Sequence, residues 1–202
     1  MTVAAERIAD RLADADLARR CTLGDELARR TLFDAHKKRV HHVLFRVLGG
    51  NRDIDDAIQE AFLEIYRSLK IYRGESLLST WIDRICVRVG IRVLRSQPRE
   101  RPVLHEIVTI DDPGRAPDRQ AEAREATRRL YAILEGVDPV HRTAFVLHAI
   151  DGRLLSEVAT IMGATVIATK LRVWRTRQRV EKLARRDELL RAYLGEDVGG
   201  ER

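Results

Sequence analysis

The 202-residue sequence has few aromatic residues, few cysteines and no long apolar run, and each shortage excludes a class of protein. Phe, Trp and Tyr make up 5% of the chain, whereas β-sandwiches draw on aromatic and β-branched residues, so the composition favours helices. The two cysteines, Cys21 and Cys86, lie far apart and form no CxxC pair, which indicates reduced thiols rather than a disulfide or a metal site. No stretch approaches the roughly 20 apolar residues of a membrane span, and residues 1–20 hold no apolar signal core. We therefore expect a soluble, cytoplasmic protein without membrane insertion.

Proline is also scarce, and its distribution divides the chain. Four of the five prolines lie between residues 97 and 118, in a stretch without helical periodicity. Because proline removes a backbone donor and disfavours helix in the preceding residue, we interpret 97–120 as a linker. The predicted organisation is an N-terminal extension at 1–15, a first module at 16–96, the linker, a second module at 121–190 and a C-terminal tail at 191–202. We expect a helix but no role for the extension, disorder at 195–202, and no sensory domain beyond the second module.

The chain does contain apolar residues at helical spacing and an excess of basic residues. The spacing predicts helices near 25–48, 53–69, 79–95, 120–135, 139–150, 155–162 and 166–186. The predicted fold class is all-α, with two small helical domains, a helical bundle and a helix-turn-helix, joined by a flexible linker. The net charge of +6 and the pI near 9.7 indicate a polyanionic partner, nucleic acid before membrane.

The predicted helix at 79–95 carries a row of arginines. On a helical wheel at about 100° per residue they gather within about 80° of each other, away from the apolar side. These arginines are Arg84, Arg88, Arg92 and Arg95. Trp81 lies beside them, and guanidinium groups next to an indole suit a strand whose phosphates need neutralising and whose bases can stack. A solvated surface helix whose Trp81 covers the core is the open alternative.

The preceding helix, at 53–69, carries the opposite charge on one face. Its acids follow i, i+3, i+7, i+11 spacing: Asp53, Asp56, Glu60 and Glu64. Such a face would repel DNA, so the functional interpretation is a docking surface for a basic protein partner. The alternative is a solvated face, which is the commoner role of a row of charges.

The second module has the spacing of a helix-turn-helix at 155–175. Ala159 is small where two helices must cross, Gly163 stands where the turn needs a positive φ, and Thr165 can cap the second helix. The second helix is strongly basic, with Lys170, Arg172, Arg175 and Arg177 in its first half. A helix of this kind suits the DNA major groove; a basic helix on a partner or membrane surface is the alternative.

Two apolar rows compete for the buried side of that basic helix. The first row is Ile167, Leu171 and Trp174, and the second is Thr169, Val173, Thr176 and Val180. The row that is buried decides which residues face DNA, and the sequence leaves both possibilities open.

Catalytic and metal-binding patterns have little support. His36, His41 and His42 lie close in sequence, but His41 and His42 point to different helix faces and no carboxylate completes a site. No phosphate-binding loop, no GxSxG motif and no paired acids are visible. We expect no enzymatic activity, no cofactor and no metal.

These motifs together resemble the extracytoplasmic-function group of the sigma-70 family of RNA polymerase sigma factors. Residues 55–63 read DDAIQEAFL, which resembles the family's acidic segment. Residues 73–76 read RGES and are followed by Thr80-Trp81-Ile82, another family pattern. In the second module, Asp151-Gly152, Glu157-Val158-Ala159, Gly163 and the spaced basic residues resemble the family's helix-turn-helix. The likeness covers about 16–95 and 125–185.

The resemblance implies a role for each charged row. The first module would bind core RNA polymerase through Asp56, Gln59 and Glu60. Its arginine helix would open and hold the non-template strand of the −10 element through Trp81, Arg84, Arg88, Arg92 and Arg95. The second module would read the −35 element of promoter DNA through Thr165, Lys170, Arg172, Arg175 and Arg177. An anti-sigma protein would restrain the factor, and polymerase would supply all catalysis.

The sequence departs from the family at two positions of the arginine helix. The family usually has Asn where Arg88 stands and often has Asp near Arg92, so both departures add positive charge to the surface that would read the −10 element. Two other functions stay open from the sequence: a stand-alone helix-turn-helix regulator that dimerises through the first module, and a hydrolase or nuclease that uses the histidines.

Overall fold

The computed structural model describes residues 2–49, 54–96 and 117–194, and within these ranges every regular element is a helical one. The predicted all-α fold class is therefore confirmed. In chain order the elements are α1 (Thr2–Thr22), α2 (Glu26–Leu48), α3 (Ile54–Ser68), a 3-10 turn η1 (Leu69–Ile71), α4 (Leu78–Ser96), α5 (Pro117–Glu135), α6 (Pro139–Phe145), a π-helical turn η2 (Val146–Ile150), α7 (Leu155–Met162), α8 (Val166–Ala184) and α9 (Glu188–Leu194). Most of the proposed linker and of the tail lies outside the described residues.

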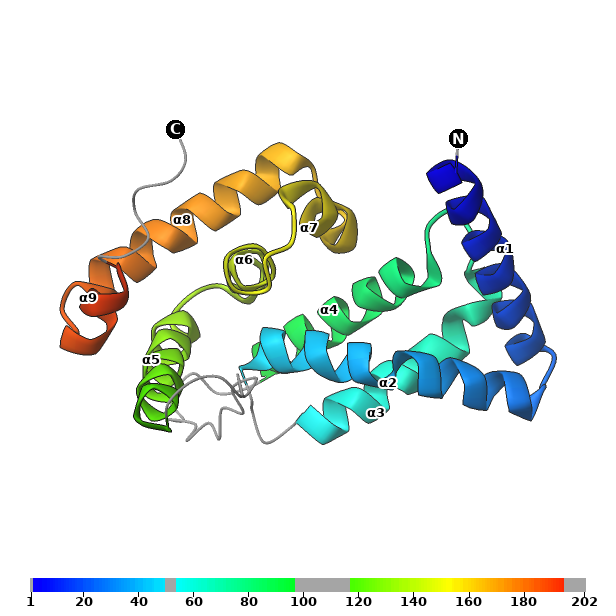
Figure 1. The fold of residues 1–202 in the computed structure, drawn as a ribbon, viewed down its shortest axis with the longest axis horizontal. Helices are drawn as coiled ribbons and strands as arrows, with labels where there is room; N and C mark the ends of the chain where they lie inside the picture. Colours follow the sequence, from blue (N-terminus) through cyan, green and yellow to red (C-terminus); the bar gives the residue numbers. More distant parts are fainter. Residues whose placement is uncertain (1, 50–53, 97–116, 195–202) are drawn as a thin grey trace.

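Helices α2, α3 and α4 form the bundle of the first module (Figure 1). Asp25 begins α2 by accepting the backbone N–H of Ala28 at 2.9 Å, and Gly49, with φ +76°, ends it as the sequence predicts. The apolar stripes of the three helices meet in a core without solvent exposure, which includes Leu32, Val40, Leu44, Ile65, Ile82 and Val89. Burial of these stripes fixes the outward faces of α3 and α4.

The N-terminal helix α1 has a structural role that the sequence did not suggest. It runs through residue 15 without a break and packs against α2 and η1, with Ala18 and Cys21 buried. Asp14 accepts the backbone N–H of Leu78 at 2.7 Å, which satisfies an otherwise unpaired donor at the first turn of α4. The extension therefore positions the start of the arginine-rich helix.

Helices α5 to α9 form the second module (Figure 1). The helix expected from about residue 120 begins at Pro117, in the first turn, where a missing backbone donor has no cost. The segment expected as one helix over 139–150 is α-helical only to Phe145 and continues as the π-helical turn η2. α6 packs against α8, and α9 packs against both α5 and α8.

The two modules pack against each other through one continuous set of buried apolar residues. α4 contacts α6 and α7, and α2 contacts η2. The second module also caps the end of α2: the Tyr131 hydroxyl donates to the carbonyl of Arg46 at 2.8 Å, and the Arg142 guanidinium donates to that of Leu48 at 2.9 Å. These bonds satisfy carbonyls that a helix C-terminus leaves unpaired.

Both cysteines are free and buried. Burial raises the pKa of the Cys86 thiol, and it also raises that of Cys21. Among the described residues, no helix combines the length and the apolar character that crossing a membrane requires.

Candidate protein and nucleic-acid interfaces

The acidic face of α3 points to solvent. Asp56, Gln59 and Glu60 are exposed and lie on the side of α3 opposite the buried Ala57, Ala61, Phe62 and Ile65. Leu63 extends the same face and has 53% of its surface exposed. Asp53, which the sequence places at the start of this face, lies outside the described residues.

The arginine row of α4 lies beside the acids of α3 and pairs with them. Arg88 contacts Glu64 at 2.6 Å, and Arg92 contacts both Glu60 at 2.8 Å and Glu64 at 3.2 Å. Burial alone would raise the pKa of Glu64, but hydrogen bonds from Arg88 and Arg92 outweigh it and hold that pKa below its ordinary value. The two departures from the family pattern therefore have partners within the first module.

Trp81 is half-buried against the core at the N-terminal end of α4. Its ring centroid lies 5.5 Å from that of Tyr72, with the ring planes inclined by 56°. The Tyr72 hydroxyl donates to the carbonyl of Ser76 at 2.7 Å, and burial raises the pKa of Tyr72 to about 12. Tyr72 was not among the predicted site residues; its place directly before the RGES motif is the signal that points to it.

Arg84, a member of the arginine row, contacts the second module. Its Nε donates to the backbone carbonyl of Thr160 in α7 at 3.0 Å. Arg88, Arg92 and Arg95 are exposed. The four arginines are thus on one side of α4, as predicted, but they are in three different settings: Arg84 against α7, Arg88 and Arg92 against α3, and Arg95 exposed.

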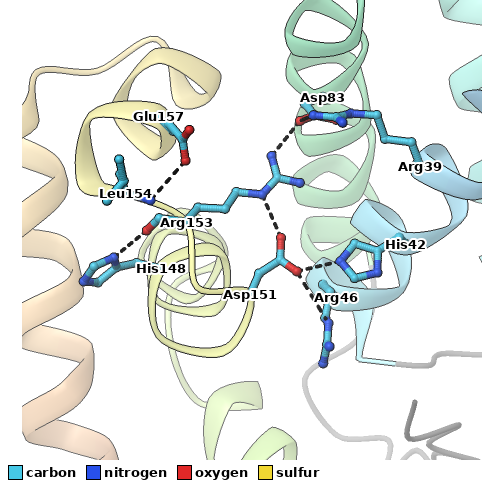
Figure 2. Close-up of polar contacts among 9 residues, drawn as sticks. All are labelled: Arg39, His42, Arg46, Asp83, His148, Asp151, Arg153, Leu154 and Glu157. Carbon is cyan, nitrogen blue, oxygen red and sulfur yellow. Dashed lines mark hydrogen bonds and ion pairs between the residues drawn. The ribbon is translucent and has the colours of Figure 1, made fainter. Parts of the chain in front are cut away.

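A polar cluster between the modules surrounds Asp83, which is fully buried (Figure 2). Arg39 of α2 binds the two carboxylate oxygens of Asp83 at 2.8 Å each, and Arg153 of the second module binds one of them at 2.6 Å. Arg153 joins this pair to a second acid, Asp151, at 2.7 Å. A buried carboxylate without partners is costly. Arg39 therefore stabilises Asp83 within the first module, and Arg153 ties it to the second.

Asp151 forms the second half of the cluster (Figure 2). Its Oδ1 lies 2.5 Å from Nε2 of His42 and 3.8 Å from Nε of Arg46. Burial alone would raise the pKa of Asp151, but hydrogen bonds from Arg153 and His42 outweigh it and hold the pKa below its ordinary value of 3.8. His42 therefore has a structural partner across the interface. Within the described residues no three His, Cys, Asp or Glu side chains gather to hold a metal.

Two local contacts fix the segment that carries Arg153 (Figure 2). His148 Nδ1 forms a hydrogen bond with the carbonyl of Arg153 at 2.7 Å, and Glu157 accepts the backbone N–H of Leu154 at 3.1 Å. The sequence offered one sign of the cluster, because Asp83 is the only acid of α4. Its pairing with Arg39 and Arg153 joins distant parts of the chain and follows from no local pattern.

The predicted helix-turn-helix is present as α7, a tight turn and α8. Ala159 is 2% exposed, Gly163 has φ +61°, and the Thr165 side chain accepts the backbone N–H of Ala168 at 3.1 Å. These three features confirm the small residue, the left-handed turn and the helix cap that the sequence predicts.

The structure settles which row of α8 is buried. The buried row is Thr169, Val173, Thr176 and Val180. Ile167, Leu171 and Trp174 point outward and are 82%, 43% and 57% exposed. Lys170, Arg175 and Arg177 are exposed and Arg172 is half-buried, and none of them pairs with a carboxylate of the described residues. The outward side of α8 is therefore apolar along its middle and basic beside it.

Comparisons with known proteins identify the family of the chain. Residues 32–100 match the family model described as sigma-70 region 2. The chain is 30% identical over 183 residues to the ECF RNA polymerase sigma-E factor of Haemophilus influenzae, covering 86% of this chain and 96% of that protein. It is 28% identical over 184 residues to the protein of the same name from Escherichia coli strain K12, covering 86% and 95%. The solved structure of CnrH in complex with the cytosolic domain of CnrY shares the fold, with a TM-score of 0.61 at 23% identity over 87% of this chain and 99% of that chain.

Proposed function

This chain belongs to the extracytoplasmic-function sigma factors of RNA polymerase, which direct promoter-specific transcription initiation, and we propose that its two modules divide promoter recognition between them. The first module binds core polymerase and the melted −10 element, and the second reads the duplex −35 element. The factor acts in the cytoplasm, and polymerase carries out the catalysis. The exposed face of α3 is the observation that carries this proposal, because a stand-alone regulator has no need of it.

The polymerase contact is assigned to Asp56, Gln59 and Glu60. All three are exposed on a face that the core leaves open, and the exposed Leu63 adds an apolar contact. Complementary charge on a basic partner would guide this encounter and fix its orientation. The chain's resemblance to sigma factors in residues 55–63 supports the same assignment.

The −10 strand is assigned to the surface of α4 that carries Trp81 and the arginine row. Arg88, Arg92 and Arg95 are exposed and can reach phosphates, while Trp81 and Tyr72 offer aromatic surface at the other end of the helix. Arg84 joins them when it leaves the carbonyl of Thr160. This surface has charge for the backbone and rings for unstacked bases, which a reader of single strands requires.

The −35 element is assigned to α8 through Thr165, Lys170, Arg172, Arg175 and Arg177. In helix-turn-helix proteins the N-terminal part of the second helix contacts base edges in the major groove. Thr165 begins α8, and the exposed Lys170 and Arg175 follow within the next turns. Phosphate contacts by this many cations make promoter binding fall steeply with salt.

A restraining anti-sigma protein is the remaining proposed partner. CnrH, which shares the fold of this chain, was solved in complex with the cytosolic domain of CnrY. For this chain, a partner that covers the outward faces of α3, α4 or α8 would block the contacts assigned above. Its competition with core polymerase for the purified chain would test the proposal.

Transcription in vitro tests the function as a whole. The purified chain, core polymerase and a library of promoter fragments should yield transcripts from a small set of fragments that share two separated elements. Failure to start transcription on every fragment, with polymerase that is active with another sigma factor, would contradict the proposal.

Charge reversal on α3 tests the polymerase contact directly. Asp56 is exposed, so Asp56→Lys leaves the core intact and introduces repulsion with a basic partner. We expect binding to core polymerase to weaken by at least about tenfold, because like charges across an interface cost several kcal/mol. The matched control is Glu122→Lys, the same charge change at an exposed position of α5. Equal affinities of the two variants for immobilised core polymerase would rule out the α3 contact.

A further inference from the structure

We propose that the apolar ridge of α8, formed by Ile167, Leu171 and Trp174, selects promoters by contacting the 5-methyl groups of thymines in the −35 element. The inference rests on the proposed role of α8 as a duplex reader and adds the residues that determine sequence preference. The cations of α8 supply affinity, whereas the ridge supplies discrimination between bases.

The ridge is a single row along the outermost line of α8. Its residues are spaced by four and then three positions, so they lie one above the other on the helix surface. They point away from the buried row of α8, which packs on the rest of the second module. The exposure of Ile167 is 82%, although isoleucine is among the residues that proteins bury most often. Three outward apolar residues in one row indicate a contact surface.

Basic side chains flank the ridge on both sides, which identifies the occupant. At about 100° per residue, Lys170 and Arg177 lie roughly 70° to 90° to one side of the ridge, and Arg175 lies roughly 70° to the other. A helix of about 10–12 Å diameter fills a major groove of about 12 Å width, so its outermost line meets the base edges and its flanks meet the two phosphate backbones. The order basic, apolar, basic across α8 matches the order phosphate, base edge, phosphate across the groove. An apolar groove on a protein partner would leave both basic flanks without counter-charges.

The base that fits an apolar ridge is thymine. The edges of adenine, guanine and cytosine in the major groove offer hydrogen-bond donors and acceptors, whereas thymine adds a methyl group. Ile167 and Leu171 have no polar atom in their side chains, so they cannot replace the water that they displace from a polar edge. Contact with a methyl group has no such cost. The ridge therefore favours thymine over cytosine on the same strand.

The length of the ridge limits where these thymines lie. From Ile167 to Trp174 the helix rises about 10 Å at about 1.5 Å per residue. Base pairs are stacked about 3.4 Å apart, so the ridge covers about three of them. Ile167 lies in the first turn of α8, where base contacts of helix-turn-helix proteins concentrate. The methyl-dependent positions should therefore be neighbours within the −35 element.

Replacement of thymine by deoxyuridine is the direct test, because it removes the methyl group and leaves the hydrogen-bonding groups unchanged. The −35 element is first identified with holoenzyme and the promoter library, and each of its thymines is then replaced singly. Loss of one buried methyl should weaken holoenzyme binding about fourfold. Each replacement is measured with the wild-type chain and with Ile167→Ala and Leu171→Ser, and with Leu12→Ala, which alters an exposed leucine of α1, as control.

The proposal requires that the methyl effect disappears in a ridge variant and persists in the control. It is overturned if wild-type holoenzyme binds thymine and uracil promoters equally, or if the ridge variants keep the full effect. It is also overturned if the ridge variants use promoters normally and lose binding to a protein partner. The variants Lys170→Ala and Arg175→Ala distinguish failure of the ridge proposal from failure of the proposed function of α8. If these two variants also leave promoter binding and its salt dependence unchanged, α8 does not read the −35 element.

Discussion

Gly49 shows how one residue connects the two modules. It ends α2 with φ +76°, and a Cβ built at this position would lie 2.3 Å from Cδ1 of Tyr131 in the second module. The same tyrosine donates to the carbonyl of Arg46, and Arg142 lies over its ring at 5.6 Å. Burial raises the pKa of Tyr131 to about 12, even further above neutral pH than the ordinary value of 10. A turn glycine that looks like a local helix stop in the sequence is therefore also a packing site.

Gly49→Ala should destabilise the chain through two separate effects. Left-handed backbone costs an alanine about 1–2 kcal/mol, and the clash with Tyr131 should add about 1–3 kcal/mol. Gly24→Ala is the matched control, since its φ is +89° but a Cβ there meets nothing within 4 Å. Urea unfolding of both variants measures the difference. Equal losses of unfolding free energy would mean that Tyr131 moves away without cost.

Asp151 gives the stability of the chain a dependence on pH. Its folded pKa is held below the ordinary 3.8, so its ionised form stabilises the fold above that pH, and the contribution is lost as the pH falls through the folded pKa. Asp151→Asn should lower the unfolding free energy by about 2 kcal/mol at pH 6 and by progressively less below pH 3.8. Asp16→Asn, at an exposed pair with Arg19, should have little effect at either pH. A loss in Asp151→Asn that is constant from pH 6 to pH 3 would contradict this origin.

At the scale of helices, the acids of α3 and a bound nucleic acid would compete for the arginines of α4. In the proposed −10 contact, phosphates would compete with Glu64, which accepts from both Arg88 and Arg92. Glu64→Gln should therefore strengthen holoenzyme binding to a single-stranded −10 oligonucleotide by up to about fivefold, because exposed pairs are worth up to about 1 kcal/mol. Glu75→Gln, at an exposed acid outside the row, is the control. Unchanged binding of the Glu64 variant in fluorescence anisotropy would show that α3 does not restrain the arginines.

The sequence predicts the helices from α2 to α8 because apolar spacing and end signals recur along that part of the chain, whereas α9 was not predicted. Asp25, Gly49, Gly163 and Thr165 occupy the helix ends that their chemistry favours. Helical periodicity alone did not identify the buried side of α8, because two rows of its residues have similar apolar content. Packing decided between them: Thr169 and Thr176 are buried with their hydroxyls bonded to backbone carbonyls one turn earlier, which removes the cost of burying them. The pairing of Arg88 and Arg92 with α3 also lay beyond local patterns, because it depends on how two helices pack.

At the scale of the whole molecule, the two surfaces proposed to read the −10 and −35 elements lie close together in the described arrangement. The centres of elements near −10 and −35 are about 25 base pairs apart, or about 85 Å at 3.4 Å per base pair. Here α4 and α7 are in contact, and Arg84 donates to the carbonyl of Thr160. The modules must therefore separate for both proposed readings to occur on one promoter. The residues that hold them together, above all Asp83 and Arg153, then set how readily the chain opens.

Arg153→Ala tests whether the polar cluster holds the modules together. The substitution removes the link between Asp83 and Asp151 but leaves Asp83 paired with Arg39 inside the first module and Asp151 paired with His42 across the interface. We expect the contact between the modules to weaken by about 1–3 kcal/mol, with a larger radius of gyration in X-ray scattering and faster hydrogen exchange along α4 and α7. Arg185→Ala, at an exposed arginine after α8, should change neither. Because closure hides Arg84, the Arg153 variant should also bind the −10 strand more tightly when free of polymerase. An unchanged radius of gyration together with unchanged exchange would mean that the shared apolar core, and not the cluster, holds the two modules closed.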